Sequence, residues 1–470
     1  MAWERVLWSG RGALAGAMAV VATWGLGCGR AERPGVAPSV LLITIDTARA
    51  DHFSSYGYGR PTTPFIDGLA REGILFEAAY TPTPTTAPAH ASLFTATYPS
   101  EHGVLKNGHV LEASRPTLAT ALQGAGYRTA AIVSSYVLAK QFGLGRGFAH
   151  YDDDFTAANS SVVVEEWEDS KGVGHFDRRA DETTERAVAW LRANGDSGPF
   201  FLWVHYFDPH HPFDPPPAQR RLLQDAAKAP ARGGRGAPDD DEDARERTLA
   251  YDAEIRFVDD QVGRLVDYLD DRLGRERTLV VVATDHGEGL MQRGWMAHGV
   301  HLHEELVRAA LIMRWPARLP SGRRVLAPVG LIDIAPTVLA LLDLEPMPTG
   351  TGSPSQALRA DGDVAQDRPL FFQRRPYDTP EHRGWDVSDP MFGIRRGRWK
   401  YIETDGTPEL FDLSADPGET RNVREQHPAT ADALGAELRA WRERVDGHPH
   451  VPQQISPEDK ARLRALGYVE

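Results

Sequence analysis

Stretches of consecutive apolar and β-branched residues recur along the chain, and each stretch closes on polar side chains. Strands are expected at residues 39–45, 128–134, 200–204 and 278–283. Runs without polar alternation indicate strands that are buried on both faces, as in a parallel sheet. Apolar residues with helical spacing predict helices at 64–73 and 117–126. Strand, helix and polar loop alternate to about residue 345, so we expect a doubly wound, mainly parallel α/β sheet flanked by helices.

The pattern changes to short strands near residue 365. Strands are expected at 370–373, 391–394, 399–402 and 409–412, with a helix at 429–444. This predicts a smaller C-terminal antiparallel-sheet subdomain over 365–470, beside a main domain over 39–350. Within the main domain, residues 220–247 combine a Pro/Gly-rich stretch with an acidic run. That composition indicates a mobile surface insertion or, alternatively, a functional lid.

The N-terminus has the layout of an export signal. Basic residues precede an apolar run from 13 to 24, and the Gly-Leu-Gly-Cys segment that ends at Cys28 resembles a bacterial lipobox. Cys28 is the only cysteine, and lipidation would explain a lone thiol in an exported protein. We expect a signal peptide over 1–27, a tether over 28–38 with a lipidated Cys28, and a protein anchored to a bacterial envelope membrane, facing the periplasm or the exterior. A cleaved signal with a chance cysteine is the alternative.

Composition limits the partners. The net charge is −14 over 470 residues and no basic stripe is visible, which argues against a nucleic-acid partner. No apolar run is long enough to span a bilayer, so membrane contact is expected only through the N-terminal lipid.

A candidate nucleophile lies in the segment Thr86-Ala87-Pro88-Ala89-His90. Proline fits the first turn of a helix, and the Ala-Ser-Leu-Phe run that follows continues it. Thr86 is therefore expected at the start of a helix, where unpaired backbone N–H groups favour an anion. Its hydroxyl would face any anionic group bound there.

Acidic side chains follow two of the predicted strands. Asp46 comes directly after the first strand, and Asp285-His286-Gly287-Glu288 follows the strand at 278–283. Open α/β sheets place their ligands at the carboxyl ends of the strands. Two carboxylates and an imidazole at that edge would make a compact, oxygen-rich site for a divalent cation. The alternative is that each residue is only a polar strand end and that Asp-His-Gly forms a loop.

These motifs resemble the sulfatase signature of the alkaline phosphatase superfamily, in which cysteine or serine opens Cys/Ser-x-Pro-x-Arg before Ala-Ser-Leu-Leu-Thr-Gly-x-Tyr-Pro. The segments at 398–401, 409–413 and 466–469 also resemble the C-terminal region of that family. Thr86 and His90 depart from the signature. Sulfatases oxidise their cysteine or serine to the aldehyde formylglycine, whereas the same oxidation of threonine would give a ketone. We therefore expect no formylglycine in this protein.

The resemblance implies that Asp46, Asp285, His286 and Thr86 hold a divalent metal ion. Sulfatases usually present a second aspartate at the first strand end, where this chain has Thr47. Loss of that carboxylate makes the site less suited to calcium and more tolerant of zinc, manganese or magnesium. The identity of the ion stays open among these four.

Two histidines match family positions around the transferred group. His210, in a Pro-His-x-Pro segment, would contact that group, and His298 would face the leaving oxygen as a proton donor. A purely structural role in a proline-rich turn is the alternative for His210. Asp208 and His210 would otherwise help to hold a second metal, as in related two-zinc phosphodiesterases.

The remaining candidates concern substrate binding. Asn107 matches an asparagine that donates to the transferred group in phosphodiesterases and phosphonate hydrolases of the superfamily, although a glycine-flanked turn is its alternative explanation. His90 takes the place of the signature arginine. The lysine and histidine of the sulfatase Gly-Lys-Trp-His segment are missing, and we expect Ser134 and Tyr136 in the pocket instead.

The resemblance therefore implies a metal-dependent hydrolase of sulfate or phosphate esters, with Thr86 as the metal-activated nucleophile. The threonine and the missing lysine favour phosphate mono- or diesters, because family relatives with threonine nucleophiles cleave these. The substrate would be a small-molecule, glycan or lipid ester. The alternatives are a cell-envelope phospho-alcohol transferase of the same fold and a non-catalytic binding protein with a decayed site.

Overall fold

Three apolar strands form the centre of a parallel sheet in the computed structural model. β1 (Ser39–Ile45), β6 (Phe200–Tyr206) and β7 (Thr278–Thr284) are buried along their whole length, and β1 pairs in parallel with the other two. These bounds confirm the predicted strands to within two residues. Burial on both faces explains why the strands carry no polar alternation.

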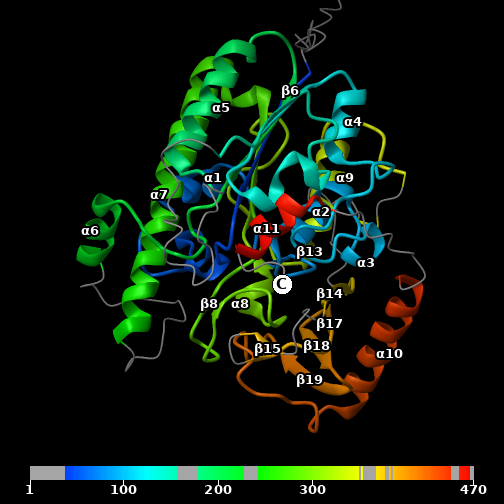
Figure 1. Cartoon of the computed structure of the whole chain (residues 1–470). Coiled ribbons are helices and arrows are strands. Elements are labelled where there is room, and N and C mark those ends of the chain that lie inside the picture. Colours follow the sequence, from blue (N-terminus) through cyan, green and yellow to red (C-terminus); the bar gives the residue numbers. More distant parts are fainter. Residues whose placement is uncertain are drawn as a thin grey trace, which may run out of the picture. The chain divides into compact units, whose positions relative to one another are not determined.

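The full sheet has eight strands in the order β12-β2-β11-β7-β1-β6-β4-β5. Figure 1 labels one of its central strands, β6. Its outer strands are β2 (Ile74–Phe76), β4 (Arg128–Ile132), β5 (His150–Asp152), β11 (Leu311–Arg314) and β12 (Arg323–Val325). β11 runs antiparallel to both of its neighbours, and the other pairings are parallel. The prediction of a doubly wound, mainly parallel α/β sheet is confirmed.

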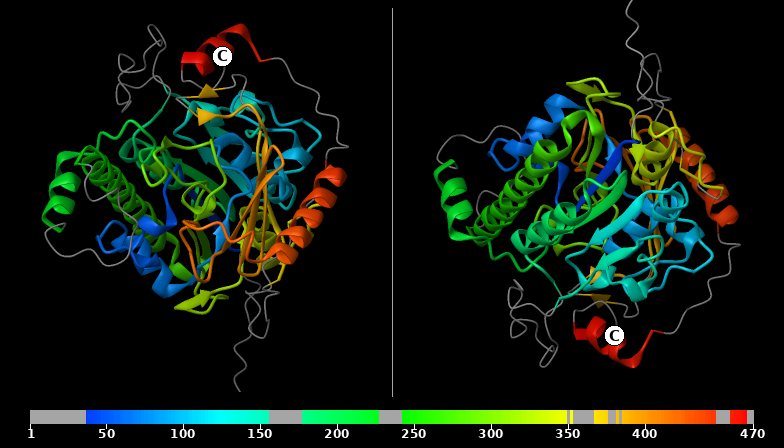
Figure 2. Two further views of the ribbon diagram at one scale, coloured as in Figure 1. Left: turned by 90° about the horizontal axis from the view of Figure 1, so that it is seen from below. Right: turned by 90° about the horizontal axis from the view of Figure 1, so that it is seen from above.

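Helices cover both faces of this sheet. α1 (Pro64–Glu72), α5 (Ala180–Asn194) and α7 (Glu242–Leu273) share one buried cluster with Leu41 and Ile43 of β1. α2 (Thr86–Thr95), α4 (Leu118–Gly124) and α9 (Ile334–Leu341) share another with Val40 and Leu42. Alternate residues of β1 therefore point to opposite helical layers, and the green helices α5 and α7 lie together on one side in Figure 2.

A four-stranded antiparallel sheet forms the C-terminal subdomain. Its order is β14 (Leu370–Arg374), β17 (Met391–Arg396), β18 (Trp399–Thr404) and β19 (Thr407–Asp412), and α10 (Pro428–Val445) packs against it. The rings of Phe371 and Trp441 stack at 4.7 Å across this contact. The predicted change to an antiparallel sheet with a terminal helix is confirmed.

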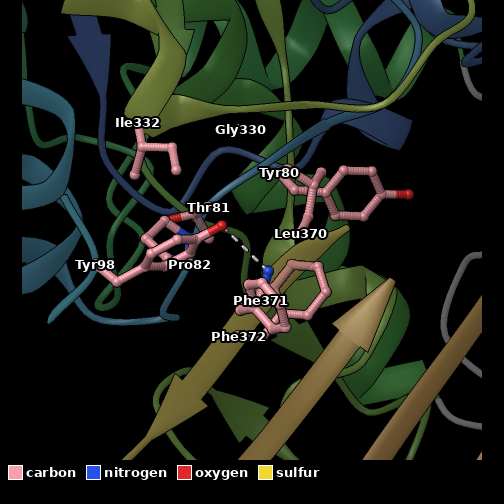
Figure 3. A pocket seen from close by; sticks show the side chains of 9 residues that line it. All are labelled: Tyr80, Thr81, Pro82, Tyr98, Gly330, Ile332, Leu370, Phe371 and Phe372. Carbon is pink, nitrogen blue, oxygen red and sulfur yellow. Dashed lines mark hydrogen bonds between the residues drawn. The ribbon is translucent and has the colours of Figure 1, made fainter. Parts of the chain in front are cut away.

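The first strand of the small sheet joins the main domain around Tyr98 (Figure 3). The Phe371 backbone N–H donates to the Tyr98 hydroxyl at 3.3 Å, and the Ser100 hydroxyl donates to Gln373 Oε1 at 2.8 Å. The cavity between them has a volume of about 10 Å³, which has room for a single water molecule at most. This cavity is therefore too small to hold a substrate.

Shorter elements complete the fold. They are β3 (Ala79–Tyr80), β10 (Arg308–Ala309) and β13 (Val329–Gly330) in one sheet, the pair β8 (Gly289–Leu290) and β9 (Met296–Ala297), the pair β15 (Glu381–His382) and β16 (Trp385–Asp386), and the helices α3 (Pro99–His102), α6 (Pro217–Ala226), α8 (Glu304–Val307) and α11 (Pro457–Ala465). The 3₁₀ turns are at 50–52, 54–56, 136–138, 140–142, 275–277 and 331–333. None of the helices in the described part of the chain is long and apolar enough to cross a membrane.

The structure describes residues 37–155, 177–226, 242–348, 351–352, 367–375, 381–382, 385–445 and 455–465. The predicted signal peptide, Cys28, nearly all of the tether and the segment 466–469 lie outside these residues. The insertion predicted at 220–247 is described only at its two ends, and both ends are helical. α6 extends to Ala226 and α7 begins at Glu242, because apolar contacts of Leu223 with Leu249 and Ala253 hold the two helices together.

Candidate active site

Three side chains from two strand ends meet beside the start of α2. Asp46 follows β1, and Asp285 with His286 follows β7, the parallel neighbour of β1. Their candidate ligand atoms all lie within 4.8 Å of one another. The closest approaches of His286 Nε2 are 3.5 Å to Asp285 Oδ2 and 3.9 Å to Asp46 Oδ1. The common edge of the parallel strands thus brings these residues together as predicted.

The unsatisfied oxygens in this cluster fit a bound cation. Both carboxylate oxygens of Asp46 and the Oδ2 of Asp285 are buried without a hydrogen-bond partner. Buried carboxylates are normally paired, hydrogen-bonded or coordinated to a metal. Among the described residues, this is the only group of three or more such side chains close enough to share one ion. Oxygen and imidazole donors suit a divalent metal.

The second metal site, considered as an alternative, lacks a cluster of ligands around Asp208 in the described part of the chain. Asp208 Oδ1 accepts the Ala180 backbone N–H at 3.0 Å, at the start of α5. Asp208 is not one of the residues in the metal-ligand cluster found in the described part of the chain. The described residues therefore form one candidate cation site, at Asp46, Asp285 and His286.

Burial raises the pKa of the Asp46 carboxyl to about 7 in the metal-free protein, from 3.8. A raised carboxyl pKa means that the folded state binds more protons than the unfolded state between about pH 4 and 7. The metal-free protein should therefore lose stability as the pH rises through this window, by about 1.4 kcal/mol per pH unit at most from this group.

Asp46→Asn should remove the contribution of Asp46 to the fall of the unfolding free energy between about pH 4 and 7. Without metal, the variant should be more stable than the wild type above pH 7. Urea unfolding in the presence of a chelator, between pH 4.5 and 8, measures both curves. Parallel curves for the two proteins would contradict the assigned pKa.

The backbone around His286 orients its ring. His286 Nδ1 lies 3.0 Å from the Gly287 carbonyl, which only accepts, so Nδ1 carries the proton and Nε2 presents its lone pair to the cluster. Glycine is required at 287, because a Cβ there would lie 1.9 Å from the Glu305 carbonyl oxygen. The Asp-His-Gly sequence therefore supplies both the ligand atom and the turn that aims it.

Thr47 occupies the place of the second sulfatase aspartate and has a structural role. Its backbone N–H donates to Asp285 Oδ1 at 3.1 Å, and its hydroxyl donates to the Pro209 carbonyl at 2.8 Å. Its φ of 53° is unusual for a β-branched residue, and such strain clusters at functional sites. Thr47 thus ties the first strand end to the loop that carries His210.

Thr86 lies where the sequence predicted it, at the first residue of α2. Its side chain is fully buried, and Oγ1 is 3.3 Å from His286 Nε2. The hydroxyl therefore adjoins the cation cluster and the N-terminal end of a helix at once. That position suits an oxygen nucleophile acting on an anionic ester.

Asn107 is hydrogen-bonded to the backbone of Ala87, the residue that follows the nucleophile. The Ala87 backbone N–H donates to Asn107 Oδ1 at 2.9 Å, which identifies the oxygen of the amide. The buried Nδ2 has no hydrogen-bond partner. Its two N–H groups are thus available to an oxygen of a bound ester, as the resemblance implied.

His90 has both ring nitrogens engaged below the nucleophile. Trp203 Nε1 donates to Thr44 Oγ1 at 2.9 Å, and Thr44 Oγ1 lies 3.0 Å from His90 Nε2. Indole only donates, so the threonine donates onward to His90, and Nδ1 donates to the Thr86 carbonyl at 2.8 Å. Burial lowers the pKa of His90 to about 4. These contacts do not support the expectation that His90 contacts substrate, because its ring nitrogens bind Thr44 and the backbone of Thr86 instead.

His210 and His298 reach the same site from two loops. Their rings are 5.0 Å apart, and the His298 ring is 4.7 Å from that of His286. His210 Nδ1 donates to the His211 carbonyl at 2.6 Å, and burial keeps the His210 pKa well below its usual value. The structure thus places both predicted histidines next to the cluster, in positions compatible with their implied roles.

Ser134 and Tyr136 do not join this group. The Ser134 hydroxyl donates to the His205 carbonyl at 2.6 Å, and the Tyr136 hydroxyl donates to Asp459 of α11 at 2.5 Å. Both hydroxyls therefore serve contacts between elements of the fold. These contacts do not support the expectation that the two residues bind substrate.

Two residues that the sequence did not single out also face the site. Glu288 Oε2 is 3.4 Å from His298 Nδ1, and His205 Nε2 is 3.4 Å from Asp46 Oδ2. Glu288 belongs to the Asp-His-Gly-Glu motif, and His205 lies near the end of a parallel strand. The motif is the signal that would have identified Glu288, whereas nothing in the sequence of the buried strand β6 distinguishes His205 as a site residue.

Comparison with known proteins agrees with this geometry. A model of the sulfatase family matches residues 38–344, and a model of the N-sulphoglucosamine sulphohydrolase C-terminal region matches residues 292–444. The uncharacterized sulfatase YidJ of Escherichia coli (strain K12) is 31% identical over 432 residues, which cover 82% of this chain and 83% of that protein.

Two solved structures share the fold. One, a complex with its substrate D-glucosamine-2-N,6-O-disulfate, has a TM-score of 0.73 at 20% identity and covers 89% of this chain and 100% of its own. The phosphonate monoester hydrolase of Agrobacterium radiobacter has a TM-score of 0.68 at 24% identity and covers 87% of this chain and 96% of its own.

These structures show that the chain has the alkaline phosphatase-like fold. More narrowly, the chain belongs to the sulfatase family. It is a hydrolase of sulfuric or phosphoric esters.

Proposed function

We propose that this protein is a metal-dependent hydrolase that cleaves phosphate mono- or diesters through a covalent ester on Thr86. The observation that carries the proposal is the position of Thr86 Oγ1, 3.3 Å from His286 Nε2 at the start of α2. Threonine cannot yield the formylglycine aldehyde, so its hydroxyl is the nucleophile that this position offers. Sulfate esters are the second candidate, since the family matches include sulfatases.

The side chains around Thr86 would have separate roles in such a reaction, in binding the cation and in binding the transferred group. Asp46, Asp285 and His286 would hold the cation, which when bound supplies positive charge to the transferred group and to the attacking oxygen. Asn107 Nδ2 is placed to donate to an oxygen of that group, and the helix start adds backbone N–H groups.

His298 and His210 have different proposed roles: His298 donates a proton to the leaving oxygen, and His210 contacts the transferred group. The Thr86 hydroxyl releases its proton to solvent, Oγ1 bonds to the central phosphorus as the bond to the alcohol breaks, and the departing oxygen takes a proton. His298, which faces Glu288 through Nδ1, is the proposed donor, and His210 is the proposed contact to the transferred group. Water then cleaves the threonine ester and restores the hydroxyl.

The preference for phosphoryl transfer is tested with purified protein, residues 37–470 or the full chain. 4-Nitrophenyl sulfate, 4-nitrophenyl phosphate and bis-4-nitrophenyl phosphate are assayed with calcium, zinc, manganese and magnesium in turn. We expect the highest kcat/KM on a phosphate ester. A strong preference for the aryl sulfate would overturn the phosphoryl assignment and leave the family membership intact.

A further inference from the structure

We infer that His205 is a positioning residue for the cation site: its imidazole binds Oδ2 of Asp46, the outer oxygen, and leaves Oδ1, the inner oxygen, to the metal. The inference rests on the cation site of the proposed function. It starts from two groups that both lack partners. Neither ring nitrogen of His205 and neither oxygen of Asp46 has a hydrogen-bond partner, although both side chains are fully buried. Buried polar groups without partners are rare enough to require an explanation.

The two oxygens of Asp46 face different histidines. Oδ2 lies 3.4 Å from His205 Nε2, whereas Oδ1 is the oxygen nearer to His286, at 3.9 Å from Nε2. The carboxylate is thus divided between an inner edge, which faces the other cluster members, and an outer edge, which faces His205. A hydrogen bond from Nε2–H to Oδ2 satisfies both orphaned groups when the carboxylate is ionised.

The strand pairing explains why His205 is in this position. β6 runs parallel to β1 with His205 opposite Thr44, and the Asp46 N–H donates to the Tyr206 carbonyl at 2.9 Å. The backbones of the two strands therefore hold the imidazole and the carboxylate side by side. The geometry does not depend on a loop.

A direct metal-ligand role fits His205 less well. The ligand atoms within 4.8 Å of one another come from Asp46, Asp285 and His286, and His205 lies outside that group. An ion shared by those three would therefore be held away from Nε2 by Asp46 itself. Residues that hydrogen-bond to a metal ligand without binding the metal themselves typically contribute to metal affinity. Their removal weakens it by about 10- to 100-fold.

The surroundings of His205 allow a clean substitution. Its ring is 5.1 Å from that of His90 and 6.4 Å from that of Trp203, so the site is aromatic. Phenylalanine keeps the ring and removes both nitrogens. Glutamine keeps an N–H near the position of Nε2. His102→Phe is the matched control, because His102 is also buried and its Nε2 lies 2.9 Å from Ser92 Oγ.

The test measures metal binding without catalysis. Wild type, His205→Phe, His205→Gln and His102→Phe are titrated with Zn²⁺ and with Mn²⁺ by isothermal calorimetry, and the rise in Tm on adding each ion is recorded. We expect His205→Phe to bind about 10- to 100-fold more weakly and to show a smaller rise in Tm. His205→Gln should recover much of the affinity, and His102→Phe should bind like the wild type.

Each result separates the two proposals. Wild-type affinity and an unchanged rise in Tm in His205→Phe would overturn the positioning role and leave the cation site intact. A glutamine variant as weak as the phenylalanine variant would also overturn it. A wild-type protein that binds neither of these ions, and neither calcium nor magnesium in the same titration, would contradict the proposed function itself. Circular dichroism of the metal-free variants checks that each one folds.

Discussion

Thr86→Ala is expected to remove ester cleavage, lowering kcat/KM on the order of 10³-fold or more. The substitution deletes the attacking oxygen and leaves a methyl group at the first residue of α2. A helix start tolerates alanine at this position, so folding should persist. The change removes the hydroxyl that lies 3.3 Å from His286 Nε2, together with the γ-methyl group of the threonine. Steady-state kinetics on the best ester and metal of the substrate panel measure the loss.

Two variants serve as controls for that loss. Thr86→Ser keeps the oxygen and should retain activity within about tenfold of the wild type. Thr85→Ala changes the neighbouring residue, whose side chain makes no capping hydrogen bond to α2, and should leave activity near wild type. Acid-quenched enzyme analysed by mass spectrometry should carry the transferred group on the peptide that contains Thr86. Undiminished turnover in Thr86→Ala would exclude the nucleophile assignment.

Asp285→Asn is expected to abolish metal binding and to reduce turnover to the level of the chelator-treated enzyme, again on the order of 10³-fold. Asp285 Oδ1 accepts the backbone N–H groups of Thr47 and His286 at 3.1 and 2.7 Å. Asparagine can keep both bonds through its oxygen. It replaces the unpartnered Oδ2 by an amide nitrogen, which cannot serve as a metal ligand.

The matching control is Asp67→Asn. Asp67 Oδ1 accepts the Ser55 backbone N–H at 2.8 Å, so asparagine can keep that bond while removing a carboxylate elsewhere. This variant should bind metal and turn over like the wild type. After treatment with a chelator, the wild-type enzyme should regain its activity when the divalent metal is added back. Asp285→Asn should gain no activity from the same addition. Full metal affinity in Asp285→Asn would show that the cation lies elsewhere.

The sequence located the cluster because strand ends are easy to recognise. Asp46 and Asp285 each follow an apolar run, and parallel strands finish at one edge of a sheet. The pairing of β1 with β7 brings the two residues together without any further assumption. Thr86 was equally accessible to prediction, since a threonine two residues before a proline marks the start of a helix.

Side-chain direction was harder to predict. Ser134 follows β4 at the expected edge of the sheet, yet its hydroxyl is taken by the His205 carbonyl. Tyr136 is held by α11, which is more than three hundred residues away in the chain. His90 replaced an arginine in a recognisable motif, but Thr44 and Trp203 engage it from two other strands. In all three cases, partners that are distant in sequence help to hold the side chain within the fold.

His205 is a residue of the site that the sequence alone does not identify. β6 is apolar on both faces, so periodicity cannot tell which of its residues points toward Asp46. Only the pairing of β6 with β1 places the imidazole at the outer oxygen of the carboxylate.

Local chemistry in the sequence was therefore enough to determine the strands, the start of the nucleophile helix and the metal-ligand candidates. These depend on apolar runs, on proline and on residues that are adjacent in the chain. The tertiary structure decided which hydroxyls and imidazoles are free to meet a substrate and which are bound within the fold. That choice depends on hydrogen-bond partners from remote elements, and such partners become known only when the sheet and its helices are assembled.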